Sequence, residues 1–182
     1  MKRIILFVVG VVAISSSPSA QAPNDAVATP LLGLPANVRE GATVIKWKPD
    51  QTYDTVQKGT NGLVCYDRSG FPLQQPFSVE CTSMGNLPRV AQNMKFEAMT
   101  DKDARQAAID AAEKDGSRAK PEFGSVWLTM NGPDQEHARI HTTIAVPGAT
   151  TQSMGLPSDN KQGGVWIMNA GTSTAHLMTP GE

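Results

Sequence analysis

The chain has 182 residues, of which 40% are hydrophobic and 18% are charged, and its formal net charge is −1 at pH 7. This length suits one domain with a sizeable core. Because no basic cluster occurs anywhere, the sequence lacks the positive stripe that a nucleic acid or an anionic membrane surface requires, and we expect neither as a partner.

The first 22 residues have the three parts of a secretory signal peptide. Lys2 and Arg3 precede an apolar run over residues 4–14, and a small-residue exit ends in Ala20-Gln21-Ala22. Eleven residues rise only about 16 Å as a helix, about half the thickness of a bilayer's hydrocarbon core, so this run is too short to span a membrane. We expect the segment to be removed and the soluble product to reside in the periplasm or outside the cell.

The chain after the signal divides into an arm and one domain. Residues 23–41 contain several prolines and glycines and are predicted to form an extended arm or linker. Residues 42–182 are predicted to form a single domain. Its β-rich stretches at 42–48, 53–57 and 63–66 indicate a meander of three short strands, and residues 67–80 are expected to form a loop.

The two cysteines, Cys65 and Cys81, both follow the signal. An even number of cysteines in an exported protein indicates a disulfide, and closing the 15 residues between them contributes about 3 kcal/mol on the chain-entropy model. The alternative is a pair of free buried thiols.

Two helices are predicted in the middle of the chain. The clearer one follows Thr100, the expected N-cap, and ends at Gly116. Its apolar face consists of alanines, which allow close approach to a sheet but bury little area. A less regular helix is expected over residues 87–98.

The last 60 residues return to strand alternation, which predicts two hairpins and completes an α+β fold: a mostly antiparallel sheet with one or two helices and the Cys65–Cys81 disulfide. If these strands join one sheet, one face is aliphatic. The opposite face gathers indole, imidazole and thioether side chains: Trp127, His141, Trp166, Met168, His176 and Met178.

Three interpretations of that second face stay open. Imidazole and thioether are the ligands that Cu(I) prefers, and the spacing of His141, Met154, His176 and Met178 resembles the His/Met pattern of periplasmic copper chaperones, which makes copper a candidate cofactor. Alternatively, Trp127 and Trp166 line a site for an organic ligand. The third interpretation is core packing, the ordinary role of Trp and Met.

Two short patterns in the chain resemble catalytic motifs, but neither lies in the secondary structure that the motif requires. His137 and His141 lie on an expected strand, about 13 Å apart, and the H-E-x-x-H pattern is absent. Ser117-Arg118-Ala119-Lys120 fits S-x-x-K but follows a helix end instead of opening a helix. We therefore assign no catalytic residue. The expected function is a non-enzymatic small-ligand-binding or structural domain, with a small secreted hydrolase as an alternative and no oligomeric state predicted.

Several short motifs in the chain resemble those of a known protein family. They are G-T-N-G at 59–62, the cysteines at 65 and 81, G-G-V-W-I-M at 163–168, G-T at 171–172 and A-H-L-M at 175–178. With these motifs the chain resembles a family of uncharacterised exported bacterial proteins over most of residues 42–179. The resemblance implies export and paired cysteines, and it implies no activity or catalytic residue. Residues 86–98 depart from that family, because they lack its tryptophan-rich stretch.

Overall fold

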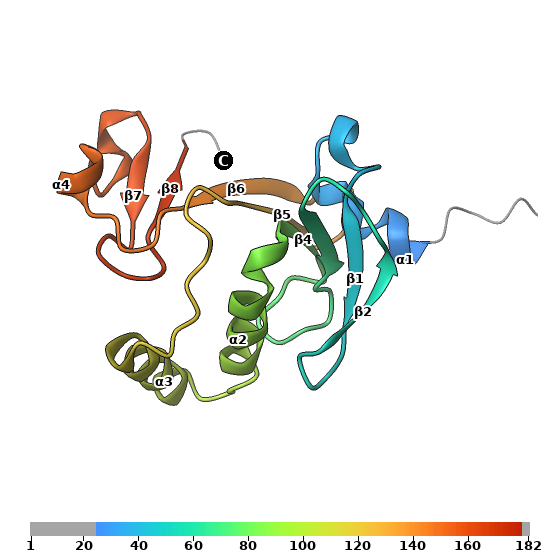
Figure 1. Ribbon diagram of the computed structural model, residues 1–182, viewed down its shortest axis with the longest axis horizontal. Coiled ribbons are helices and arrows are strands. Elements are labelled where there is room, and N and C mark those ends of the chain that lie inside the picture. Colours follow the sequence, from blue (N-terminus) through green and yellow to red (C-terminus); the bar gives the residue numbers. More distant parts are fainter. Residues whose placement is uncertain (1–24, 180–182) are drawn as a thin grey trace, which may run out of the picture.

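An eight-stranded sheet runs through the computed structural model, which describes residues 25–179 (Figure 1). The predicted signal peptide lies outside these residues. The strand order is β2-β1-β3-β4-β5-β6-β8-β7, and every pairing is antiparallel except that of β1 with β3. The predicted α+β fold with a mostly antiparallel sheet is confirmed.

The strands are β1 (Thr43–Trp47), β2 (Tyr53–Gln57), β3 (Leu63–Asp67), β4 (Phe77–Ser83), β5 (Val126–Gly132), β6 (Arg139–Ala145), β7 (Trp166–Met168) and β8 (His176–Met178). The helices and 3-10 turns are α1 (Asp25–Ala28), η1 (Pro30–Gly33), η2 (Ala36–Val38), η3 (Met84–Asn86), α2 (Leu87–Glu97), α3 (Lys102–Asp115), α4 (Thr151–Met154) and η4 (Asn160–Gln162). Within the described residues, no helix is long and apolar enough to cross a membrane.

The expected three-strand meander is wrong, because β3 pairs with β1 in parallel and not with β2. The G-T-N-G loop explains the difference. The backbone N–H groups of Thr60 and Asn61 donate to the carbonyl of Gly41 at 2.7 and 3.0 Å, so the loop crosses the start of β1. A Cβ on Gly59 would lie 2.3 Å from that same carbonyl oxygen, and only glycine permits this crossing.

The predicted loop over residues 67–80 is wrong in its last part, which forms the beginning of a strand. β4 begins at Phe77 and lies in the middle of the sheet between β3 and β5. Its sequence alternates apolar with polar residues, and both sets are buried, including Ser78, Glu80 and Thr82. A central strand that buries a polar face lacks the aliphatic pattern by which such strands are recognised.

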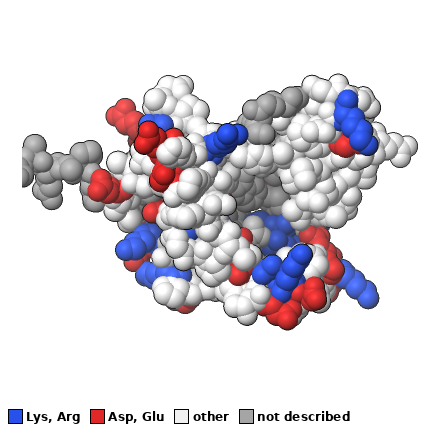
Figure 2. Space-filling view, turned by 180° about the vertical axis from the view of Figure 1, so that it is seen from behind, with Lys and Arg blue, Asp and Glu red and all other residues white. Residues whose placement is uncertain are grey.

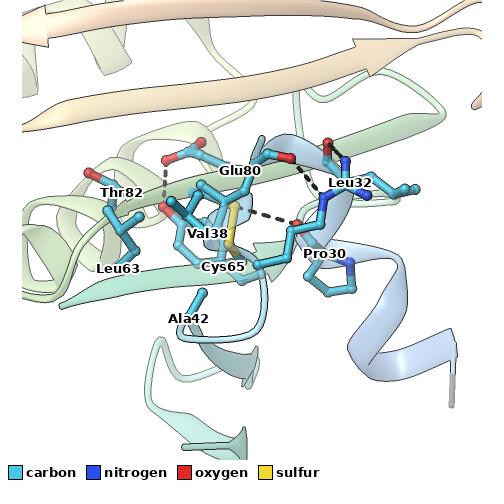
Figure 3. Close-up of a disulfide and its surroundings, with 12 residues drawn as sticks. Pro30, Leu32, Val38, Ala42, Leu63, Cys65, Glu80 and Thr82 are labelled. Atoms are coloured by element: carbon cyan, nitrogen blue, oxygen red, sulfur yellow. Dashed lines mark hydrogen bonds between the residues drawn. A yellow bond between two sulfur atoms is a disulfide. The ribbon is translucent and has the colours of Figure 1, made fainter. Parts of the chain in front are cut away.

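The segment before the sheet is not extended. It forms α1, η1 and η2, and Leu34, only 1% exposed, packs against Cys65 and Cys81. Figure 3 shows Pro30 and Val38 on either side of Cys65, with Ala42 below. The predicted disulfide is confirmed: the two cysteines face each other across β3 and β4 with their Cα atoms 4.1 Å apart.

The two longer helices, α2 and α3, lie on one side of the sheet (Figure 1), and the segment with α1 and η1 packs on the opposite face. α2 packs its apolar face against Ile45, Trp47 and the side chains of β3 to form one core cluster. α3 contacts α2 instead of the sheet, and only Ala112 of its residues is buried. Its N-cap is Asp101, whose carboxylate accepts from the Ala104 N–H, and not the predicted Thr100.

Candidate functional site

A cavity of about 280 Å³ lies between α2 and the middle strands of the sheet. Its walls come from α2, β4, β5 and β6, from the residues around Arg118, and from the start of β8. The space-filling view shows the molecule hollowed between α3 and the part that contains β7 and β8 (Figure 2). This volume is slightly below the range of ligand pockets, about 300 to 1,000 Å³, so any occupant is small.

Three arginines line the cavity, and all are buried: Arg68 is 3% exposed, Arg89 3% and Arg118 7%. Arg68 pairs with carboxylates, since its guanidinium contacts Glu80 at 3.4 Å and Glu97 more closely. A buried cation with a carboxylate partner is a common structural feature. Arg68 therefore does not by itself indicate a ligand.

Among the described residues, Arg89 is held by neutral oxygens alone. Its Nη1 donates to the Ala119 carbonyl and to the Ser173 hydroxyl, and its Nη2 donates to the Thr174 hydroxyl, each at 2.8 Å. These contacts use three of the five N–H groups of the guanidinium. They fix the orientation of Arg89 without neutralising its charge.

Arg118 is held in the same way. Its Nη1 donates to Gln92 Oε1 at 2.7 Å, its Nη2 donates to Asn93 Oδ1 at 2.6 Å, and its guanidinium lies 5.0 Å from the centre of the Phe96 ring. Within residues 25–179, neither Arg89 nor Arg118 forms an ion pair with a carboxylate.

The two cations disfavour each other. Burial and then the charge of Arg118 lower the pKa of Arg89 to about 10, and the nearby Glu113 only partly offsets this. Burial likewise lowers the pKa of Arg118 from its ordinary value. Both groups remain cations at neutral pH, so the protein carries the desolvation cost of two buried charges that a bound anion would relieve.

Glu80 is the most constrained carboxylate in the cavity. It accepts from the Tyr66 hydroxyl at 2.5 Å and from Trp127 Nε1 at 2.6 Å through one oxygen, and from Arg68 through the other. Burial, together with the charge of Glu80, raises the pKa of Tyr66 well above 10. Glu80 therefore fixes the positions of Tyr66, Trp127 and Arg68 in and behind the cavity wall.

The structure brings together two of the residues predicted to form a site. Trp127 and His176 line the cavity, and His176 Nδ1 lies 2.7 Å from the Thr174 carbonyl. Strand register places His141, Trp166 and Met178 on the same face of the sheet as these two, as alternation predicts.

The other predicted site residues do not line the cavity: His141, Met154, Trp166 and Met178. Trp166 is not among the described residues that line the cavity, so Trp127 and Trp166 do not form one site there. Met154 packs against the aliphatic cluster around Val146 and Ile167. Copper binding by His141, Met154, His176 and Met178 stays a prediction. In the described part of the chain, no group of three or more His, Cys, Asp or Glu side chains is arranged to hold a metal ion.

Sequence reasoning missed the arginines and glutamates of the cavity. One signal was present in the sequence: Arg89, Asn93 and Glu97 recur every four residues and form a polar line along the otherwise partly apolar α2. Arg68 and Arg118 lie in loops, where no periodic pattern marks a side chain that turns inward.

Comparisons of the chain with models of protein families, with curated proteins and with solved structures gave no match.

Proposed function

We propose that this protein is an exported binding protein that holds a small anionic molecule in the cavity beside α2. The observation that carries the proposal is the pair of buried guanidiniums, Arg89 and Arg118, which line an open cavity and have only neutral partners among the described residues. Carboxylate and phosphate groups accept the paired N–H donors that such guanidiniums offer.

A binding role is favoured over catalysis by the state of Glu80, the carboxylate beside Trp127 in the cavity wall. Both oxygens of Glu80 are engaged by fixed donors, which leaves that group poorly placed to take a proton from a substrate. Export is supported by the residues that form the predicted signal peptide, and the disulfide is compatible with an oxidising compartment.

The test is isothermal titration calorimetry of the purified mature protein with hexanoate and, separately, with inorganic phosphate. We expect at least one of them to bind, and the Arg89→Gln variant to lose tenfold or more in affinity, since a hydrogen bond to a charged group contributes about 1.5 to 3 kcal/mol.

The matched control is Arg139→Gln, which removes an exposed arginine on the same sheet face outside the cavity. It should bind like the wild-type protein. The proposal fails if neither anion binds, or if both variants weaken binding equally.

A further inference from the structure

The cavity beside α2 differs in charge from one end to the other. Arg89, Asn93 and Glu97 lie four residues apart on α2, and all three line the cavity. Because a helix rises 1.5 Å per residue, the first and last of them are separated by about 12 Å along the axis. The cationic end extends from Arg89, near the start of α2, to Arg118, which donates to Gln92 and Asn93 in the middle of α2, and the acidic end lies in the last turn at Glu97.

The acidic end has an excess of carboxylates. Two of them, Glu80 and Glu97, share one guanidinium, that of Arg68. The contacts of Glu97 with Arg68 and Gln74 both fall on Oε2, and no contact of Oε1 with another described residue is formed. Its side chain is 24% exposed, so Oε1 remains available to a donor in the cavity.

The cationic end has the opposite excess. Among the described residues, neither Arg89 nor Arg118 forms an ion pair with a carboxylate. Glu113 contacts Arg89 through the hydroxyl of Ser173, and the charges of Glu113 and Glu97 only partly offset the effect of burial on the pKa of Arg118. A ligand with a single negative charge satisfies this end and leaves the acidic end unused. A ligand that carries both charges, with the correct separation, satisfies both.

The wall between the ends is polar but uncharged. Thr129 and Thr143 line it from the sheet, and Asn93 lines it from α2. Asn93 accepts from Arg118 through Oδ1, and its Nδ2 donates to no other described residue. Hydroxyl and amide groups of this kind match the amides of a peptide backbone better than they match a methylene chain.

From this arrangement we infer that the cavity takes a short peptide with free termini, its carboxylate at Arg89 and Arg118 and its ammonium at Glu97. Two or three residues suit the span, because an extended chain covers about 3.3 to 3.6 Å per residue and the arginine and glutamate side chains reach inward. The inference rests on the proposed binding of an anion and adds the identity of the rest of the ligand.

The test compares triglycine with two blocked forms by calorimetry on the mature protein. N-acetyl-triglycine lacks the ammonium, and triglycinamide lacks the carboxylate. We expect triglycine to bind at least tenfold more tightly than either, and free glycine, which is too short for the span, to bind at least tenfold more weakly.

The outcomes separate the two proposals. If N-acetyl-triglycine or glycine binds as tightly as triglycine, the peptide inference is overturned while anion binding stands. If triglycinamide binds as tightly as triglycine, the carboxylate is unnecessary and anion binding itself is overturned. If neither triglycine nor N-acetyl-triglycine binds while hexanoate or phosphate does, the peptide inference alone is overturned, and if hexanoate and phosphate fail to bind as well, both proposals are overturned.

A variant checks the acidic end directly. Glu97→Gln keeps an acceptor for Arg68 but removes the charge, so triglycine should bind about tenfold more weakly while N-acetyl-triglycine binds as before. The unchanged acetylated peptide shows that the cavity is intact. Glu136→Gln, an exposed glutamate outside the cavity, is the matched control and should leave both affinities unchanged. Equal weakening of both peptides by Glu97→Gln would contradict the placement of the ammonium.

Discussion

Arg89 and Ser173 are 84 residues apart in the chain, and their side chains meet at 2.8 Å. The hydroxyl of Ser173 accepts from the Arg89 guanidinium and donates to the Glu113 carboxylate. One buried serine thus connects α2, α3 and the segment that leads into β8. This connection holds the cationic end of the cavity in place.

Ser173→Ala should lower the free energy of unfolding by about 1 to 3 kcal/mol, because it removes one hydrogen bond from the buried Arg89 and one from Glu113, both of them to a charged group. Urea denaturation followed by far-UV circular dichroism measures this. Ser158→Ala, at an exposed position, should change stability by less than about 0.5 kcal/mol. Similar midpoints for the two variants would show that the connection contributes nothing to stability.

Replacing both cysteines by alanine should cost about 3 kcal/mol of stability, as expected for opening a loop of this length. The disulfide is fully buried, so the wild-type protein should resist reduction until it unfolds. Denaturation with and without a reductant tests both points. The reductant should destabilise the wild-type protein and leave the double variant unaffected, and a double variant as stable as the oxidised protein would contradict the prediction.

Leu34→Ala should destabilise the protein by about 2 to 5 kcal/mol, the usual cost of removing a large apolar side chain from a core. Leu34 lies before the predicted start of the domain at residue 42, yet it packs on the disulfide. Leu73, which is 65% exposed, provides the control, and Leu73→Ala should have little effect. If Leu34→Ala and Leu73→Ala have the same melting temperature, the segment before β1 is not part of the core.

Hexanoate should bind with constant affinity near neutral pH and more weakly as the pH rises through about 10. The guanidinium of Arg89 attracts an anion only while it is protonated. Because its pKa in the folded protein is about 10, the guanidinium loses its proton in this range. The charges that act on Arg89 are those of Arg118 and Glu113, and burial raises the pKa of Tyr66. Calorimetry from pH 7 to 11 measures the loss, which should be absent from Arg89→Gln.

Local patterns predicted most elements of this fold. Alternation identified the β5–β6 hairpin and the strands β7 and β8, and the Asp and Gly residues around α3 marked its ends within one residue. The pairing of β1 with β3 escaped prediction because it depends on a long-range approach between Gly59 and Gly41. Neighbouring strands in sequence usually pair, and here a backbone contact reverses that tendency.

The candidate site was less accessible to sequence reasoning. Trp127 and His176 were singled out, and both line the cavity, because period-2 alternation places side chains reliably on a sheet face. Arg68, Arg89 and Arg118 were missed, since arginine is normally expected at the surface and no local pattern tells which arginine turns inward. Their burial is a property of the tertiary fold.

An open sheet has two outer strands whose backbone groups invite pairing with another molecule, and this chain protects both against such self-association. On one side, the outer strand β2 carries a bulge at Val56, opposite Val44 and Ile45 of β1, and Asp54 of β2 pairs with Lys48 at 2.6 Å, so the outer strand is twisted and charged. On the other side, β7 has only three residues and offers too short a template for an added strand. The two outer strands of the sheet thereby resist pairing with a second copy of the chain.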